Sequence, residues 1–353
     1  MTRLILHFGT HKTGTTAIQG VLASKRSMLS SRGICYPESW KFFGGNAKQN
    51  SANAHAHIST ALARNEPSDI RRLRKFSEHL QKEAQTHHTI VLSAEAFNRR
   101  VFSVPGQSGE LAGREAFLDR VRDYFSNFET EVAIVYRRPD QYAESMYSES
   151  IANSQSVLSF DGFLKRSEVR FNYGFQLKSL EERFPTLVAK FDDLKDDLVN
   201  QFLLKLSLDV SFPKEDEIRR TSISKAGTLW LRRSKRENRE MEKREKNLRW
   251  LFALQSANAS VFGTQNKTSF WSNSRKRDEH IRTSLEGFTR LTFDMPSQAA
   301  PRLCSWDDNQ HFIAENAYKA WLEKDAQRIS RRLAAQMLPF VDPDGGPIEA
   351  GVS

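Results

Sequence analysis

Short apolar runs alternate with amphipathic stretches along the first 200 residues. Residues 4–8 form a mostly apolar run that ends at Gly9, which is typical of a buried strand. From Thr15 onward the apolar residues recur at helical spacing, so a tight loop and then a helix are predicted. Further apolar runs predict strands at 89–92, 132–136 and 187–191, and an amphipathic helix is expected at 117–125. Strands that alternate with helices predict an α/β fold of the P-loop type, a parallel β-sheet flanked by helices.

Two segments of this first part lack periodicity. Residues 44–57 are rich in Asn, Ala and His, and residues 104–113 contain one proline and three glycines. We expect both to be loops over the carboxyl edge of the sheet, where ligands bind in such folds.

The character of the chain changes near residue 214. Long, charged helical patterns follow at 229–254 and 313–337, and the last 15 residues hold three prolines and three glycines. The expected organisation is an α/β domain at 1–213, a helical, basic C-terminal extension packed on it at 214–338, and a flexible tail at 339–353.

Composition narrows the class of protein. The chain has 353 residues, and its only cysteines, Cys35 and Cys304, are far apart. They exclude a disulfide framework and a cysteine-based zinc site, and they suit a reducing compartment. The apolar run at the N-terminus is too short for a signal peptide, and no stretch is long enough to cross a bilayer. We therefore expect a soluble, cytoplasmic protein.

The net charge of +10 suggests an anionic partner: nucleic acid, anionic lipid, a phosphorylated cofactor or an acidic glycan. Most of this excess is local, because residues 219–249 hold 12 Lys and Arg against 4 Asp and Glu. The interleaved glutamates favour a solvated helix face over a nucleic-acid surface. Peripheral contact with a membrane stays open, and the sequence gives no oligomeric state.

The segment between the first strand and the first helix carries the sharpest chemical signal. Backbone N–H groups of such a turn, together with a helix N-terminus, form a cradle for an anion, and a lysine adds a full charge. The lysine stands inside the loop, whereas a standard Walker A loop places it directly after the second glycine. The candidate anion-binding residues are Thr10, His11, Lys12, Thr13, Gly14, Thr15 and Thr16.

Residues 12–16 match the pattern Lys-(Ser/Thr)-Gly-Thr-Thr, and the segment resembles the 5′-phosphosulfate loop of sulfotransferases that use 3′-phosphoadenosine 5′-phosphosulfate (PAPS). A second match follows the predicted strand at 132–136, where Arg137 precedes Ser145 by eight residues. In the bacterial-type members of this family, an Arg and a Ser at that spacing bind the 3′-phosphate. The resemblance covers about residues 1–225.

The resemblance implies that a sulfuryl group moves from PAPS to an acceptor hydroxyl and leaves adenosine 3′,5′-bisphosphate (PAP). By analogy with the family, the expected acceptor is a carbohydrate or glycolipid. Lys12 would stabilise the charge that develops on the bridging oxygen. No metal is required, because the transferred sulfate carries less charge than a terminal phosphate. The acceptor itself is not fixed by the fold.

An acceptor hydroxyl needs a general base, and three candidates stand in the sequence. Glu95 follows the second long strand, at the place where related sulfotransferases carry their catalytic group. Glu38 lies 26 residues after Lys12, much as in some glycan-modifying members. His55, or its neighbour His57, titrates near neutral pH. We favour Glu95, because a strand end is a rigid position.

Two other classes of function remain open. A P-loop nucleotide-dependent kinase would use the same loop with Mg²⁺ held by an acidic strand end, and Asp192 or Asp193 follows the fourth predicted strand. A non-catalytic anion-binding module would instead rely on the basic helix, with binding that falls steeply with salt.

Overall fold

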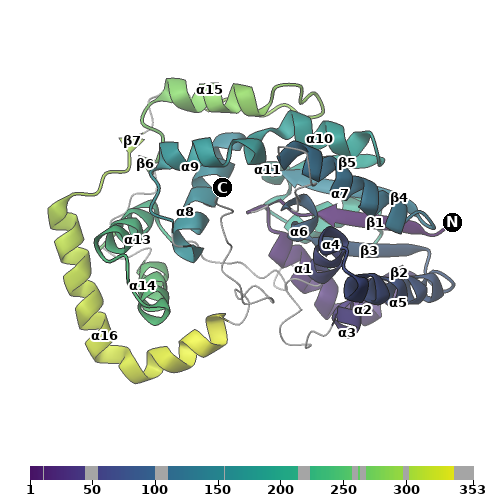
Figure 1. The fold of residues 1–353 in the computed structure, drawn as a ribbon, viewed down its shortest axis with the longest axis horizontal. Helices are drawn as coiled ribbons and strands as arrows, with labels where there is room; N and C mark the ends of the chain where they lie inside the picture. Colours follow the sequence, from purple (N-terminus) through teal and green to yellow (C-terminus); the bar gives the residue numbers. More distant parts are fainter. Residues whose placement is uncertain are drawn as a thin grey trace. The chain divides into compact units, whose positions relative to one another are not determined.

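A five-stranded parallel sheet organises the first half of the chain in the computed structural model (Figure 1). The structure describes residues 1–10, 12–43, 55–99, 110–154, 156–213, 223–256, 261–262, 268–296 and 302–337. The strand order is β2-β3-β1-β4-β5, so the first strand is central. The strands are β1 (Arg3–Phe8), β2 (Ile34–Cys35), β3 (Thr89–Ala94), β4 (Glu129–Tyr136) and β5 (Thr186–Lys190). This confirms the predicted α/β class and parallel sheet.

The register brings the carboxyl ends of the strands to one edge. Phe8 at the end of β1 pairs with Ala94 of β3 on one side and with Ile134 of β4 on the other. The four predicted strands are all present, although Phe191 begins a helix and does not end β5. The edge strand β2 was not predicted, because two residues are too few to show a period.

Helices connect the strands, and the last described helix ends at Met337. Their bounds are α1 (Thr15–Ser24), α2 (Arg26–Ser31), α3 (Trp40–Phe43), α4 (Ala56–Arg64), α5 (Pro67–Glu83), α6 (Glu95–Arg99), α7 (Glu110–Tyr124), α8 (Pro139–Asn153), α9 (Phe160–Arg166), the 3₁₀ helix Glu168–Phe171, α10 (Tyr173–Glu181), α11 (Phe191–Leu194), α12 (Leu198–Lys205), α13 (Lys225–Glu237), α14 (Lys243–Gln255), α15 (Ser274–Ser284) and α16 (Asp308–Met337).

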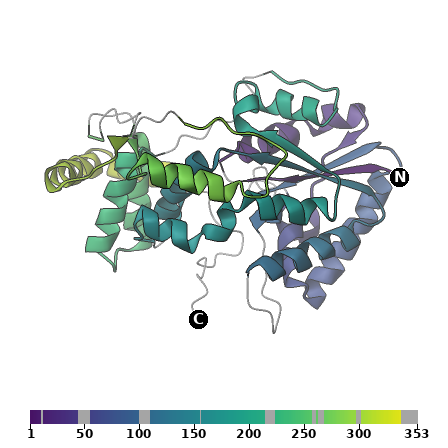
Figure 2. The same cartoon turned by 90° about the horizontal axis from the view of Figure 1, so that it is seen from above.

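Both faces of the sheet are covered, because alternate residues of each strand point to opposite sides. On one face, Ile5 and Val91 pack with apolar residues of α1 and α12, such as Ile18 and Phe202. Figure 2 shows α1 and α12 on one side of the sheet, with α7 and α10 on the other. All of the strand residues 4–6 are fully buried, which explains the near-continuous apolar runs in the sequence.

The chain divides into two compact units. The first comprises Met1–Arg138, Val169–Arg219 and Ser284–Phe293, and contains the five-stranded sheet. The second comprises Pro139–Glu168, Arg220–Thr283 and Asp294–Ser353. Both units are built from separate stretches of sequence, whereas the sequence predicted one division near residue 214. That boundary stays a prediction.

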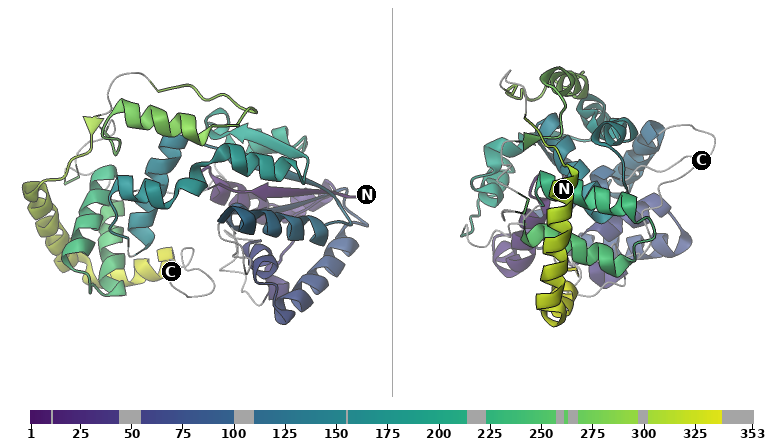
Figure 3. Two further views of the ribbon diagram at one scale, coloured as in Figure 1. Left: turned by 45° about the horizontal axis from the view of Figure 1, so that its top comes forward. Right: turned by 90° about the vertical axis from the view of Figure 1, so that its left-hand side faces the viewer.

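The second unit is mainly helical, with a two-stranded parallel sheet of β6 (Thr268–Ser269) and β7 (Arg302–Leu303). The predicted helix at 229–254 is wrong in one respect, because the chain breaks at residues 238–242 and forms α13 and α14. Asn238 leaves helical geometry at the end of α13, and α14 begins after Glu242 in extended conformation. The two helices lie side by side (Figure 3). The helix predicted at 313–337 is confirmed as α16.

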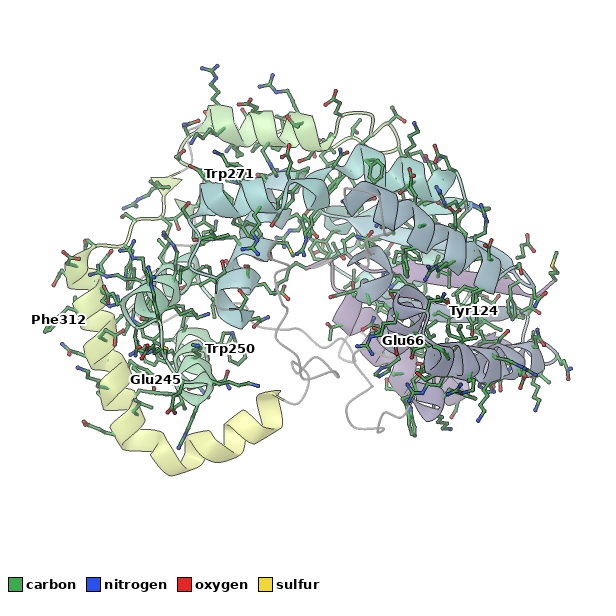
Figure 4. The ribbon with its side chains drawn as sticks, in the orientation of Figure 1. Glu66, Tyr124, Glu245, Trp250, Trp271 and Phe312 are labelled. Carbon is green, nitrogen blue, oxygen red and sulfur yellow. The ribbon has the colours of Figure 1, made fainter. Side chains whose placement is uncertain are left out.

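Some basic residues of the second unit form contacts within that unit. The Arg249 guanidinium lies 4.6 Å from the ring centre of Tyr318 and pairs with Glu245 at 2.8 Å and with Glu315 at 2.5 Å. Figure 4 shows Glu245 on α14, and Phe312 on the outer side of α16, where 66% of its surface is exposed. The basic stretch is therefore more than a solvated helix face.

Several predicted segments lie partly or wholly outside the described residues. They include residues 44–54 and 104–109 of the two expected loops and the expected tail at 339–353. The second predicted loop, at 104–113, is too long, because α7 already begins at Glu110. Among the described residues, no helix has the length and hydropathy needed to span a membrane.

A histidine lies in the core of the first unit. His7 of β1 is fully buried, its Nδ1 is 2.8 Å from the Ser93 hydroxyl, and its ring packs 4.5 Å from that of Phe202. Burial lowers the pKa of His7 from 6.5 to about 3, because the charged ring would lose its hydration. The folded protein therefore holds a neutral imidazole.

This burial predicts a loss of stability in acid. Between pH 6.5 and 3 the unfolded state binds a proton that the folded state does not, so stability is present above pH 6.5 and falls as the pH drops. From pH 7 to pH 5 we expect His7 to cost about 2 kcal/mol. Urea unfolding of wild type and His7→Leu at both pH values measures this difference. The exposed His88→Gln is the control, and an equal pH effect in wild type and His7→Leu would contradict the prediction.

Candidate functional site

The loop after β1 turns sharply before the first helix. Lys12 has a φ of +63° and Gly14 a φ of +76°, so two of three consecutive residues adopt left-handed geometry. Gly14 is the N-cap of α1, which begins at Thr15 without a capping side chain. Left-handed residues before a helix N-terminus direct backbone N–H groups to one side, as in anion-binding turns. His11 lies outside the described residues.

Buried threonines fix the shape of this loop. The Thr10 hydroxyl donates to the Val135 carbonyl of β4 at 2.5 Å, and the Thr13 hydroxyl donates to the Thr10 carbonyl at 2.8 Å. The Thr15 hydroxyl points at the same carbonyl, at 3.4 Å. These three side chains hold the loop itself, whereas Lys12 and Thr16 are half-buried. The residues best placed for a ligand are therefore Lys12, Thr16 and the backbone amides.

Glu95 lies directly beside the loop. It is the first residue of α6, immediately after β3, and the Gly9 amide donates to the Ala94 carbonyl at 3.3 Å. A Cβ atom on Gly9 would lie only 3.0 Å from Cγ of Glu95 and 2.6 Å from the Thr15 side chain. The glycine at this position therefore lets a carboxylate and the helix start approach the end of β1.

Arg137 stands on the other side of β1, at the carboxyl end of β4. Its guanidinium lies 5.5 Å from the ring centre of Phe191, which follows β5, and its carbonyl accepts the Tyr173 hydroxyl at 2.9 Å. Strand β4 ends two residues beyond Ile134, the partner of Phe8, so Arg137 belongs to the same edge as the loop. Ser145 lies on α8 in the second unit and is half-buried there.

Glu38 is held by two cations. Its carboxylate is 2.5 Å from the Lys41 ammonium and 4.0 Å from the Arg26 guanidinium. The hydrogen bond from Lys41 lowers the pKa of Glu38 below its ordinary value. A carboxylate stabilised in this way is a weak proton acceptor. We therefore do not propose Glu38 as the general base.

His55 is fully buried and both of its ring nitrogens bind backbone. Nε2–H donates to the Pro37 carbonyl at 2.9 Å, and Nδ1 accepts the Ser93 amide at 2.9 Å. Burial lowers the pKa of His55 to about 4. The ring joins the segment after β2 to strand β3, so His55 has a structural role. His57 stacks on Phe43, 6.4 Å between ring centres.

The acidic residues after β5 are turned to solvent. Asp192 and Asp193 are exposed in the first turn of α11. Asp192 lies 3.3 Å from the Lys195 ammonium, and Asp193 lies 3.9 Å from that of Lys190. Carboxylates paired with surface lysines are poorly suited to hold the magnesium ion of a kinase.

Sequence reasoning missed the residues that support the loop from behind. Leu198 of α12 packs against Gly14, where an added Cβ would lie 2.0 Å from its Cδ2. The Gln19 amide of α1 donates to the carbonyl of Ser93 at 3.0 Å and reaches its hydroxyl at 3.2 Å. The contact of Gln19 had a signal in the sequence, because a glutamine stands on the apolar face of the predicted helix. Nothing in the sequence indicated the contact between Leu198 and Gly14.

The glycine at the start of α1 gives a direct test of this geometry. Gly14→Ala adds a Cβ to a left-handed residue and drives it into Leu198, so we expect a loss of about 2–4 kcal/mol. Gly287→Ala is the matched control, because Gly287 has a φ of +72° but no atom within 4 Å of an added Cβ. That variant should lose only about 1 kcal/mol. Chemical denaturation measures both, and equal losses would contradict the proposed packing.

No family model and no curated protein matches this chain.

Proposed function

We propose that the protein is a PAPS-dependent sulfotransferase with a P-loop-type fold. One observation carries the proposal: the loop with Lys12 leaves the central strand of the sheet, between Glu95 on one side and Arg137 on the other. In open parallel sheets, ligands bind at the carboxyl edge where the order of strands reverses, and here that point is β1. The resemblance of residues 12–16 to the phosphosulfate loop supports the same conclusion.

In this proposal the donor is held by charge and by backbone amides. The amides of residues 14–16 and the Lys12 ammonium bind the 5′-phosphosulfate. Arg137 binds the 3′-phosphate with its planar fork of donors, and Phe191 beneath the guanidinium limits its orientation. Ser145 is the second 3′-phosphate ligand that the resemblance implies. None of these roles requires a metal.

The transfer step needs one base and one stabilised leaving group. Glu95 takes the proton of the acceptor hydroxyl while that oxygen attacks the sulfur. The bond between sulfur and the bridging phosphate oxygen breaks, and Lys12 stabilises the charge that collects on this oxygen. The products are the sulfated acceptor and PAP. A carbohydrate or glycolipid hydroxyl as acceptor, like a cytoplasmic location, rests on the resemblance and on the sequence alone.

A nucleotide-dependent kinase is the second candidate, and Glu95 is the observation that favours it. A carboxylate at the end of a strand next to the loop is where P-loop enzymes hold Mg²⁺. Against it, the position directly after the second glycine is Thr15, which is buried, and not a lysine. Binding of ADP with Mg²⁺ separates the two candidates.

Calorimetric binding of PAP tests the donor site. We expect wild type to bind PAP more tightly than ADP, with or without Mg²⁺. Lys12→Ala and Arg137→Ala should each weaken PAP about 10–100-fold, because each removes a charge-assisted contact. Arg138→Ala is the matched control for charge and should bind nearly as wild type does. Preference for ADP with Mg²⁺ would favour the kinase, and no binding of either nucleotide would favour a different anion.

Transfer of labelled sulfate from PAPS to a panel of hydroxyl acceptors tests the base. Glu95→Gln should lower the rate about 10²–10⁴-fold, because a general base is lost, and leave PAP affinity unchanged. Glu38→Gln is the control and should retain activity, since Glu38 is already paired with Lys41. Full turnover by Glu95→Gln would remove Glu95 from this role.

A further inference from the structure

A cysteine, a glutamate and a histidine lie close together near the amino end of β3, away from the loop that contains Lys12. Cys35 lies in β2, Glu83 is the last residue of α5, and His87 follows one turn later. The Cys35 sulfur is 3.6 Å from Oε2 of Glu83, and Nδ1 of His87 is 3.3 Å from the same oxygen. All three ligand atoms lie within 4.8 Å of one another. Nothing in the proposed transfer reaction uses them.

These distances suit one tetrahedral ion. With bonds of about 2.3 Å to sulfur and about 2.0 Å to nitrogen and oxygen, tetrahedral ligands stand about 3.5 Å apart for S···O and about 3.3 Å for N···O. The observed separations of 3.6 Å and 3.3 Å are nearly the same. These two separations suit a zinc ion, the Cys35 sulfur and Nδ1 of His87 lie within 4.8 Å of each other, and a fourth position is left for water.

The histidine ring has contacts at both nitrogens. Nε2 is 2.9 Å from the Ser30 hydroxyl of α2, whereas Nδ1 lies 3.0 Å from the Glu83 carbonyl oxygen and 3.0 Å from the Thr86 hydroxyl. A zinc ion bound at Nδ1 would replace these two contacts, with the ring proton on Nε2. Histidines that bind metal ordinarily make such a second hydrogen bond, which fixes the tautomer. Ser30 lies in α2, Cys35 in β2 and Glu83 in α5, so three separate elements contribute to the site.

The thiol and the imidazole of the cluster are mostly buried, and its carboxylate is partly exposed to solvent. Cys35 is 7% exposed and the His87 side chain 10%, whereas 29% of the Glu83 side chain is exposed. Solvent therefore reaches the carboxylate while the thiol stays covered. A thiolate, an imidazole and a carboxylate together suit zinc better than magnesium or calcium, which prefer oxygen ligands only.

We propose that Cys35, Glu83 and His87 form a zinc-binding site that fastens the end of α5 to the edge strand β2. Cys35 pairs with Ile90, four residues before the end of β3, so the site lies about 13 Å along that strand from the edge that carries the loop. The ion would act on structure and not on the transferred group. The cluster contains one of the two cysteines, and a mixed site needs only one thiolate.

Metal titration of the full chain tests the proposal. After treatment with a chelator, the protein should bind about one equivalent of Zn²⁺ by calorimetry. Co²⁺ in its place should give a thiolate-to-metal charge-transfer band. Cys35→Ser and His87→Gln should each lower Zn²⁺ affinity at least about 10–100-fold. Cys304→Ser and His88→Gln are matched controls and should bind as wild type does.

The outcomes are distinct from those of the transfer reaction. Zinc should raise the unfolding temperature of wild type and not of Cys35→Ser, because only binding to the folded state stabilises. Cys35→Ser should still bind PAP, since the two sites are separate. Circular dichroism without metal confirms that each variant is folded. Absence of the cobalt band in wild type, or equal loss of affinity in Cys304→Ser, would overturn the proposal.

Discussion

The hydrogen bond from the Thr10 hydroxyl to the Val135 carbonyl sets the geometry on which the candidate site depends. It joins the end of β1 to the neighbouring strand through a fully covered contact, where an unmade bond would be costly. Because Thr13 and Thr15 both point at the carbonyl of Thr10, the same residue also organises the turn into α1. This small network fixes the backbone on both sides of Lys12.

The second constraint is that β1 is buried on both faces, so its polar neighbours must satisfy one another. Ser93 of β3 shows how this is done. Its hydroxyl meets His7 and Gln19, and its amide donates to His55. These contacts link the segment after β2, strand β3 and helix α1 behind the loop. Burial in this region lowers the pKa of both His7 and His55.

The positive charge of the chain has a different significance from the one its net value suggests. In the second unit, the buried Lys235 ammonium binds the Ile151 and Ser154 carbonyls near the end of α8. Arg249 is enclosed by aromatic rings and two glutamates. These cations hold helices together, so they are not available as a landing surface for an anionic partner. In the proposed function, the donor is bound by Lys12 and Arg137 of the first unit, and not by these cations.

Much of the fold was accessible from sequence because its signals are local. Apolar runs predicted all the longer strands, and the residues from Gly9 to Thr16 predicted a turn between strand and helix. Local patterns failed where the reason was elsewhere in the chain. The two residues of β2 form a strand only because β3 lies beside them. The break at Asn238 was hidden in a continuous helical pattern, and the start of α7 at Glu110 lay in a glycine-containing segment without periodicity.

The candidate site divides in the same way. The sequence by itself determined the residue types of the loop and the positions of Glu95 and Arg137 at strand ends, because each depends on a few neighbours in the chain. Only the tertiary structure showed how the environments of the candidate bases differ, since the Glu38 carboxylate pairs with Lys41 and both ring nitrogens of His55 bind backbone groups. It also brought Cys35 to Glu83 and His87 across 48 residues. Pairings of this kind depend on how strands and helices stack, and no local pattern records them.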